Sequence, residues 1–192
     1  MTTLQELLND LASGDETRAE NAAAALSGLG ESAFPSLLDL TRSPDADTRW
    51  WAVRALAQSP HCRTEWLIPF LIEDPVPEVR QCAALGLAGK ADESAIQPLI
   101  RALSDADGMV GSLAATALVK IGGAAVPFLI EVVESGRQVA RVNALRALAE
   151  IRDPRAIPAM MKVMEEGSCL MQHWAQEGLE RLGLNMIYVK PD

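Results

Sequence analysis

Apolar residues recur along this chain with the spacing of one helix face, and the whole pattern repeats six times at intervals of about 30 residues. In most copies an opening apolar residue is followed three, four and seven positions later by further apolar residues. The series reads Leu4/Leu7/Leu8/Leu11, Phe34/Leu37/Leu38, Ile96/Leu99/Ile100/Leu103, Val126/Leu129/Ile130/Val133 and Ile157/Met160/Met161/Met164, and the third copy opens at Ile68. This spacing marks one face of an α-helix, and a period in this range predicts stacked helical units.

Each copy contains two such stretches, which we name helix A and helix B. Helix A often carries proline one position after its opening residue, where the missing N–H is tolerated: Pro35, Pro69, Pro127 and Pro158. Asp, Ser, Gly and Pro fill the break before helix B, as expected of a turn that ends one helix and caps the next. The pattern predicts an all-α fold, a right-handed α-solenoid of about six antiparallel helix pairs.

The period also predicts how the chain is divided. We expect one domain over residues 1–184, because neighbouring repeats share their cores. Its repeats are expected at about 2–31, 32–61, 62–92, 93–123, 124–153 and 154–184. The remaining residues, 185–192, fall outside the repeat and are expected to pack on the last helix or to be mobile.

A second marked position lies on helix B, fifteen residues after the opening residue in most copies and twelve after it in the third. It is occupied by Ala19, Arg49, Arg80, Gly111, Arg141 and Gln172. The segments SPDADTRWWAVRAL and DPVPEVRQCAALGL around this position resemble HEAT repeats of the short, alanine-rich type found in phycobilin lyases, and the resemblance covers residues 2–184. It implies that an arginine at the marked position pairs with an acidic residue of an A–B turn.

The implied pairing gives a structural ladder that ties neighbouring repeats together. Arg49, Arg80 and Arg141 match the pattern, and the candidate acidic partners are Asp45, Asp47, Asp74 and Asp105. Ala19 and Gln172 lie in the terminal repeats, which are expected to be atypical. Gly111 interrupts the ladder, and the sequence offers no reason for it.

The exposed side of helix B is the candidate binding surface. With the marked position as zero and 100° per residue, positions +1 and +5 lie opposite the apolar stripe, and position +2 lies at its edge. In HEAT solenoids the B helices line the concave face, so these positions predict a groove that binds a partner. The residues predicted to line it are Trp50, Trp51, Arg54, Gln81, Leu85, Leu113, Val142, Arg146, His173 and Trp174. In the alternative interpretation, Trp51 and Trp174 cover the next repeat.

Composition and charge narrow the classes of partner. The chain has 192 residues, is 49% apolar, and carries a net charge of −9, which disfavours nucleic acid. The N-terminus lacks the features of a signal peptide, and no apolar run is long enough to span a membrane. The three cysteines form no close pairs. These features predict a cytoplasmic protein with no nucleic-acid or membrane partner.

Few residues offer chemistry. His61 and Cys62 are adjacent in an irregular link, and some phycobilin lyases that also isomerise their chromophore carry a similar His-Cys pair. Cys169 and His173 have the spacing of two metal ligands on one helix, but the sequence supplies no third ligand near them. We therefore predict no catalytic, cofactor-binding or metal-binding residues, and a surface loop is the simpler interpretation of His61 and Cys62.

Two functions remain open. The first is a non-catalytic scaffold that binds a protein, a peptide or a second copy of the chain in its concave groove. The alternative, which rests on the family resemblance, is a bilin lyase-like protein that handles a tetrapyrrole, with Arg54 and Arg146 holding its propionates.

Overall fold

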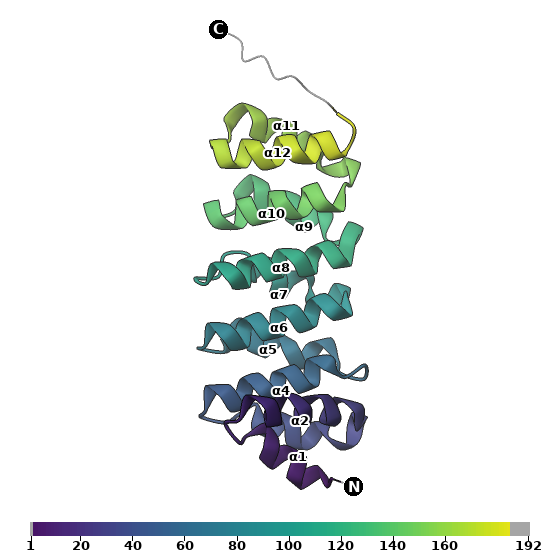
Figure 1. Ribbon diagram of the computed structural model, residues 1–192. Helices are drawn as coiled ribbons and strands as arrows, with labels where there is room; N and C mark the ends of the chain where they lie inside the picture. Colours follow the sequence, from purple (N-terminus) through teal and green to yellow (C-terminus); the bar gives the residue numbers. More distant parts are fainter. Residues whose placement is uncertain (1, 185–192) are drawn as a thin grey trace. The chain divides into compact units, whose positions relative to one another are not determined.

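The computed structural model describes residues 2–184, and every regular element in that range is helical (Figure 1). The twelve α-helices are α1 Leu4–Leu11, α2 Glu16–Gly28, α3 Phe34–Leu40, α4 Ala46–Gln58, α5 Thr64–Glu73, α6 Pro77–Lys90, α7 Ile96–Ala102, α8 Gly108–Ile121, α9 Val126–Ser135, α10 Gln138–Ile151, α11 Ile157–Glu166 and α12 Cys169–Arg181. The predicted all-α fold of about six helix pairs is confirmed. The expectation for the tail at 185–192 lies outside the described residues.

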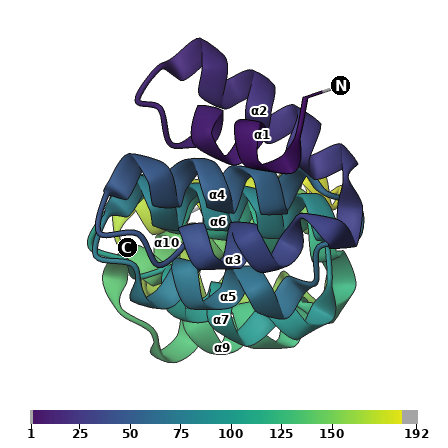
Figure 2. The same cartoon turned by 90° about the horizontal axis from the view of Figure 1, so that it is seen from below.

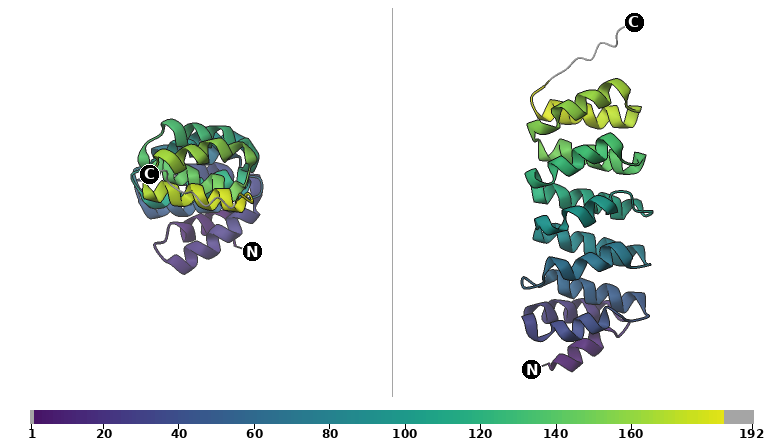
Figure 3. Two further views of the ribbon diagram at one scale, coloured as in Figure 1. Left: turned by 90° about the horizontal axis from the view of Figure 1, so that it is seen from above. Right: turned by 180° about the vertical axis from the view of Figure 1, so that it is seen from behind.

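The chain divides into two compact units, residues 1–98 and 99–192. In the first unit α4 and α6 form one layer and α3 and α5 form the other, while α2 packs on α4 (Figure 2). In the second unit α10 packs between α8 and α12, and α9 and α11 pack on α10 and α12 respectively (Figure 3). The prediction of a single domain stays a prediction.

Two positions of helix B build the core of both units. Position +3 is alanine in every copy and position +7 is leucine in every copy, and all twelve side chains are buried. They are Ala22, Ala52, Ala83, Ala114, Ala144 and Ala175, and Leu26, Leu56, Leu87, Leu118, Leu148 and Leu179. The small alanine side chains let helices approach closely, and the leucines fill the space between them.

The third repeat is more regular than its sequence indicates. Its helix A, α5, begins at Thr64, four residues before the predicted opening at Ile68, so that Pro69 lies inside the helix. Thr64 is buried and donates a hydrogen bond from Oγ1 to Asp92 Oδ2 at 2.9 Å. The prediction of a late start was wrong because a hydrogen-bonded threonine occupies the position that other repeats give to an apolar residue.

The arginine ladder is present, and it joins one repeat to the next. Arg49 donates from Nε and Nη2 to the two carboxylate oxygens of Asp74, at 2.9 and 3.1 Å. Burial opposes the ionisation of Asp74, but hydrogen bonds from Arg49 and from the Val76 backbone N–H outweigh it and lower the pKa of this carboxyl. Asp45, another candidate partner, instead caps α4 by accepting from Thr48.

The marked side chains also bind backbone carbonyls of their own A–B turns. Arg80 Nη1 donates to the carbonyl of Asp74 at 2.9 Å. In the second unit the acceptor is the backbone carbonyl of the residue eight positions before the marked position. Arg141 Nε donates to Val133 O at 2.7 Å, and Gln172 Nε2 donates to Met164 O at 3.0 Å. Gln172 therefore replaces the arginine in this bond.

The backbone carbonyl at the equivalent position of its own repeat explains why residue 111 is glycine. Leu103 O, eight residues before Gly111, accepts a hydrogen bond from Asn143 Nδ2 at 3.0 Å. A Cβ atom on residue 111 would lie 2.9 Å from that nitrogen and 3.1 Å from Leu103 O. Glycine leaves the space through which the next repeat supplies the missing donor, so the ladder continues with a different side chain.

This arrangement predicts that Gly111→Ala lowers the free energy of unfolding by about 1–3 kcal/mol, because the methyl group displaces Asn143 from Leu103 O. Gly108→Ala is the matched control: nothing lies within 4 Å of the added carbon, and alanine favours the helix. Thermal melts of both variants, and of Gly111→Ala combined with Asn143→Ala, measure the effect. Equal melting temperatures for the two single variants would contradict this explanation, and strict additivity in the double variant would also count against it.

Candidate ligand site on the B helices

The two adjacent tryptophans of α4 form an aromatic corner on the first unit. Both side chains are half-buried, and their rings meet edge to face with centroids 4.7 Å apart and planes at 89°. Their positions, +1 and +2, differ by 100° around the helix, so Trp50 turns away from the core stripe. The pair presents aromatic surface that is partly open to a ligand.

Arg54 lies one turn further along α4 and faces both rings. Its guanidinium carbon is 5.4 Å from the Trp50 ring centroid and 5.8 Å from that of Trp51. Nη2 donates to Glu20 Oε1 on α2 at 2.6 Å, whereas Nε is buried and has no acceptor among residues 2–184. Arg54 is thus held in place, and its side chain is 30% exposed.

The neighbouring helix α6 completes this surface. Leu85 is one of its most exposed apolar side chains, and the Cys82 thiol lies 4.0 Å from the Trp50 carbonyl. Burial raises the pKa of Cys82 to about 12, although Arg54 opposes the shift. The thiol is therefore neutral at neutral pH. Glu20 and Cys82, at positions +1 and +2, also belong to this surface, although neither is among the predicted lining residues.

The second unit carries a related surface. Trp174 is half-buried and meets the exposed His173 edge to face, with ring centroids 5.3 Å apart. Arg146 donates from Nη2 to the Ser112 carbonyl at 3.0 Å and to Ser112 Oγ at 2.8 Å. Leu113 and Val142 are half-buried beside it. Here the arginine is bonded to backbone and hydroxyl, and no described carboxylate pairs with it.

Trp51 also has a second environment. It lines a cavity of about 510 Å³ with Leu11 of α1, Glu16 of α2, and Asp45 and Asp47 at the start of α4. This placement supports the alternative interpretation, in which Trp51 covers a neighbouring repeat. Trp50 is not in the lining, so it remains the better candidate for direct ligand contact.

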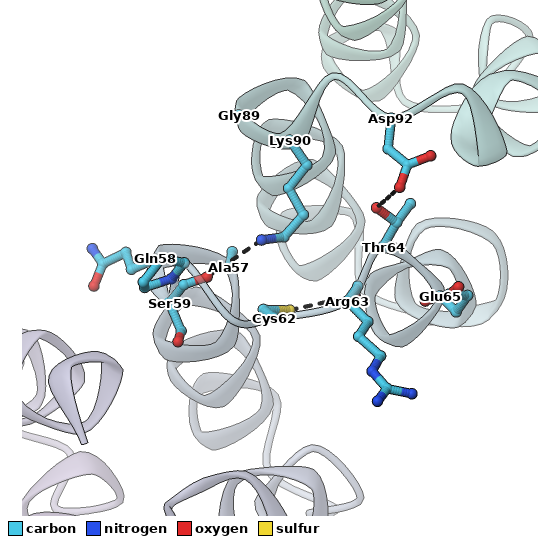
Figure 4. Close-up of a pocket in the computed structure, with 11 residues that line it drawn as sticks. Ala57, Gln58, Ser59, Cys62, Arg63, Thr64, Glu65, Gly89, Lys90 and Asp92 are labelled. Atoms are coloured by element: carbon cyan, nitrogen blue, oxygen red, sulfur yellow. Dashed lines mark hydrogen bonds between the residues drawn. The ribbon is translucent and has the colours of Figure 1, made fainter. Parts of the chain in front are cut away.

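His61 and Cys62 do not act as a pair in this structure. His61 is exposed and lines a small cavity with Leu29 and Gly30, whereas Cys62 is buried and lines a separate one of about 700 Å³ (Figure 4). Burial raises the pKa of Cys62, so its thiol is neutral at neutral pH. The Arg63 guanidinium extends away from the sulfur. The geometry supports the loop interpretation over thiol–imidazole chemistry.

Cys169 and His173, the other residues with candidate chemistry, have different surroundings. Cys169 is the exposed first residue of α12, and His173 packs its ring against Trp174. Within residues 2–184 no three His, Cys, Asp or Glu side chains gather as a set of metal ligands. None of the helices described is both long and apolar enough to cross a membrane.

Two family models match the chain. One, described as HEAT repeats, covers residues 64–141, and the other, the PBS lyase HEAT-like repeat, covers residues 140–166. Residues 64–166 are therefore built of HEAT repeats, and those at 140–166 match the type named for PBS lyases. Arg80 and Arg141 lie within the matched residues, whereas Arg49 and its segment SPDADTRWWAVRAL lie before them.

Two similar proteins carry the name phycocyanobilin lyase subunit beta. The one from Nostoc sp. (strain PCC 7120) is 34% identical over 91 residues, which are 47% of this chain and 44% of that protein. The one from Pseudanabaena tenuis (strain PCC 7409) is 38% identical over 81 residues, 42% of this chain and 29% of that protein. This HEAT-repeat chain therefore spans less than half the length of these relatives.

Solved structures show the same architecture. The complex of CpcE and CpcF of phycocyanin lyase from Nostoc sp. PCC7120 contains a chain that is 25% identical, with a TM-score of 0.59 over 75% of this chain and 96% of that one. The archaeal HEAT-like repeats protein from Thermococcus onnurineus NA1 has a TM-score of 0.64 over 99% of this chain and 84% of that one. At 15% identity, the archaeal protein shows the fold alone.

The similar proteins overturn one prediction. The sequence predicted a non-catalytic protein because no catalytic residue set was visible, yet its relatives are subunits of lyases. Prediction failed because the repeats carry no recognisable catalytic motif: an enzyme subunit built on this scaffold has the same periodic pattern as a passive one.

Proposed function

We propose that this HEAT-repeat protein is a subunit of a bilin lyase-type enzyme and that it holds a linear tetrapyrrole. The observation that carries the proposal is the corner formed by Trp50, Trp51 and Arg54, in a chain whose relatives are phycocyanobilin lyase subunits. Tetrapyrrole rings stack on aromatic surfaces, and propionate groups pair with guanidinium.

Charge and hydrogen bonding favour Arg54 as the anchor for a propionate. Glu20 accepts a hydrogen bond from Nη2 of its guanidinium, and the Arg54 side chain is still 30% exposed. A propionate oxygen that pairs with the exposed part of this guanidinium leaves the Glu20 ion pair intact. The exposed Leu85 on α6 extends the apolar surface under the pigment.

The neutral thiols favour reversible binding of the pigment. Covalent attachment through sulfur requires a thiolate, and burial raises the pKa of both Cys82 and Cys62. Cys82 lies against the aromatic corner, so its protonation keeps this thiol from attacking the pigment. Such a subunit holds the tetrapyrrole and can still release it.

A protein partner is the second part of the proposal. The structurally similar Nostoc chain belongs to a complex of two proteins. We assign the partner contact to the B-helix surface of the second unit, where Leu113, Val142, Arg146, His173 and Trp174 lie. The first unit is left for the pigment.

Titration with phycocyanobilin, followed by visible absorption, tests the pigment site. We expect Arg54→Ala to weaken binding about tenfold, because a charge-assisted bond is worth more than 1 kcal/mol. Arg18→Ala is the matched control, since Arg18 of the same unit pairs with Asp10 at an exposed surface position. Equal affinities for the two variants would remove Arg54 from the site. Acid denaturation of the wild-type complex should release free pigment, as expected for non-covalent binding.

A further inference from the structure

Three exposed apolar side chains occupy equivalent places in the second unit. Met109, Val139 and Leu170 are 56%, 55% and 55% exposed, although each is a large hydrophobic residue. Each is the second residue of its B helix, in α8, α10 and α12. In the first unit the same position holds Thr17, Asp47 and Glu78. We name Met109, Val139 and Leu170 the apolar row.

The apolar row lies two residues before the marked position, on the exposed face of the B helices. At 100° per residue it falls between positions +5 and +2, away from the core stripe. Helices α8 and α12 both pack on α10, and neighbouring packed helices lie about 8–10 Å apart, so the row is about 20 Å long. Gln138 Nε2 donates to Ser168 Oγ at 3.1 Å and links two of the helix starts. The row is therefore carried by a fixed scaffold.

The turns beside the row are acidic. Glu134, Glu165 and Glu166 are exposed and form no ion pair with any described residue, and Arg137 is the basic residue among them. The partial positive charges at the N-termini of α10 and α12 are offset by the partial negative charges at the C-termini of α9 and α11, which lie in the same turns. An excess of negative charge remains along one side of an apolar track.

We infer that the apolar row docks an amphipathic helix of a partner protein, with apolar residues about seven apart and lysine or arginine along one flank. The B helices lie about 10 Å apart. At a rise of 1.5 Å per residue, this distance equals two turns, or about seven residues, of a bound helix. The basic flank follows from Glu134, Glu165 and Glu166. The inference goes beyond the proposed function, to which it adds the chemistry of the docking partner.

A second copy of this chain fits the surface less well. The chain carries 26 acidic and 17 basic side chains, so two copies repel one another. The imbalance is greatest in residues 1–98, which hold fifteen acidic and seven basic side chains. At the row itself, a basic partner is favoured by Glu134, Glu165 and Glu166.

The test uses two synthetic 18-residue helices labelled with fluorescein, one of leucine and lysine and one of leucine and glutamate. Fluorescence anisotropy with the full chain, without pigment, should show binding of the lysine helix alone. The triple variant Met109→Ser/Val139→Ser/Leu170→Ser should bind it at least about tenfold more weakly. The control Leu29→Ser/Ile72→Ser removes two other exposed apolar side chains from the first unit and should bind as the wild type does.

Three results would overturn the inference. The first is equal binding by the triple variant and the control, which would mean that the lysine helix is held by the acidic surface of the first unit. The second is comparable binding of the glutamate helix. The third is self-association of the wild type that the triple variant loses, which would identify a second copy as the occupant. Phycocyanobilin affinity is measured on the same triple variant and should be unchanged, so failure here is distinguishable from failure of the pigment site.

Discussion

Arg49→Ala should lower the free energy of unfolding by about 3–5 kcal/mol, the range for breaking one side of a buried ion pair. The Asp74 side chain is only 4% exposed and that of Arg49 only 11% exposed, so removal of the guanidinium leaves a carboxylate that water barely reaches. Arg49 also holds the carbonyls of Ser43 and Pro44, which would lose their donor. Urea or thermal unfolding measures the loss.

Arg42→Ala is the matched control for this prediction. Arg42 pairs with Asp39 on the same unit, but the two side chains are 81% and 79% exposed, and such pairs contribute little. We expect an almost unchanged melting temperature. If Arg42→Ala and Arg49→Ala destabilise the chain equally, the ladder is not the feature that couples these repeats.

The Arg49–Asp74 pair also predicts the effect of acid. The pKa of Asp74 is lowered in the folded state, so its contribution is present above the pKa of the unfolded chain, near 4, and is lost as pH falls through the lower folded value. Between about pH 5 and pH 2 the wild type should lose more stability than Asp74→Asn. Parallel loss in both proteins would contradict the assignment.

Trp50→Ala should weaken phycocyanobilin binding at least about tenfold while the chain keeps most of its stability. Trp50 is half-buried and turns away from the core, so its removal leaves no fully enclosed cavity. It does remove one wall of the aromatic corner and the ring that faces Arg54. Pigment titration and thermal melting of one protein sample measure the two effects.

Trp66→Ala is the matched control. Trp66 is also half-buried, but it packs edge to face on Phe34, away from the residues assigned to the site. Its loss should lower the melting temperature and leave pigment affinity unchanged. The opposite outcome for Trp50→Ala, with a large drop in melting temperature and normal affinity, would return Trp50 to the core.

The helix pairs and the core could be predicted from sequence because they depend only on the period at which apolar residues recur. Alanine at position +3 and leucine at position +7 recur in every copy, and all are buried. The exceptions are places where a hydrogen bond to a distant residue replaces the side chain that the repeat pattern predicts. Thr64 opens α5 through its bond to Asp92, and Asn143 supplies the donor that Gly111 lacks. Such replacements depend on a residue 28 to 40 positions away, which a local pattern does not contain.

The candidate site could be predicted only in part. Positions +1, +2 and +5 identified Trp50, Trp51 and Arg54 correctly as neighbours, because helix geometry fixes their relation. The bond between Arg54 and Glu20 joins residues 34 apart, and the separation of His61 from Cys62 depends on loop conformation. The apolar row was missed because its residues lie in the first turn of each B helix, before the marked position that served as the reference.

The most direct test of the central claim is a visible circular dichroism spectrum of phycocyanobilin mixed with the wild-type chain. A tetrapyrrole held against Trp50 and Arg54 is fixed in one asymmetric conformation, so we expect an induced visible signal together with a red-shifted, intensified absorption band. The signal should saturate with added protein and weaken in Arg54→Ala. A spectrum identical to that of free pigment at saturating protein would contradict the proposal that this HEAT-repeat protein holds a tetrapyrrole.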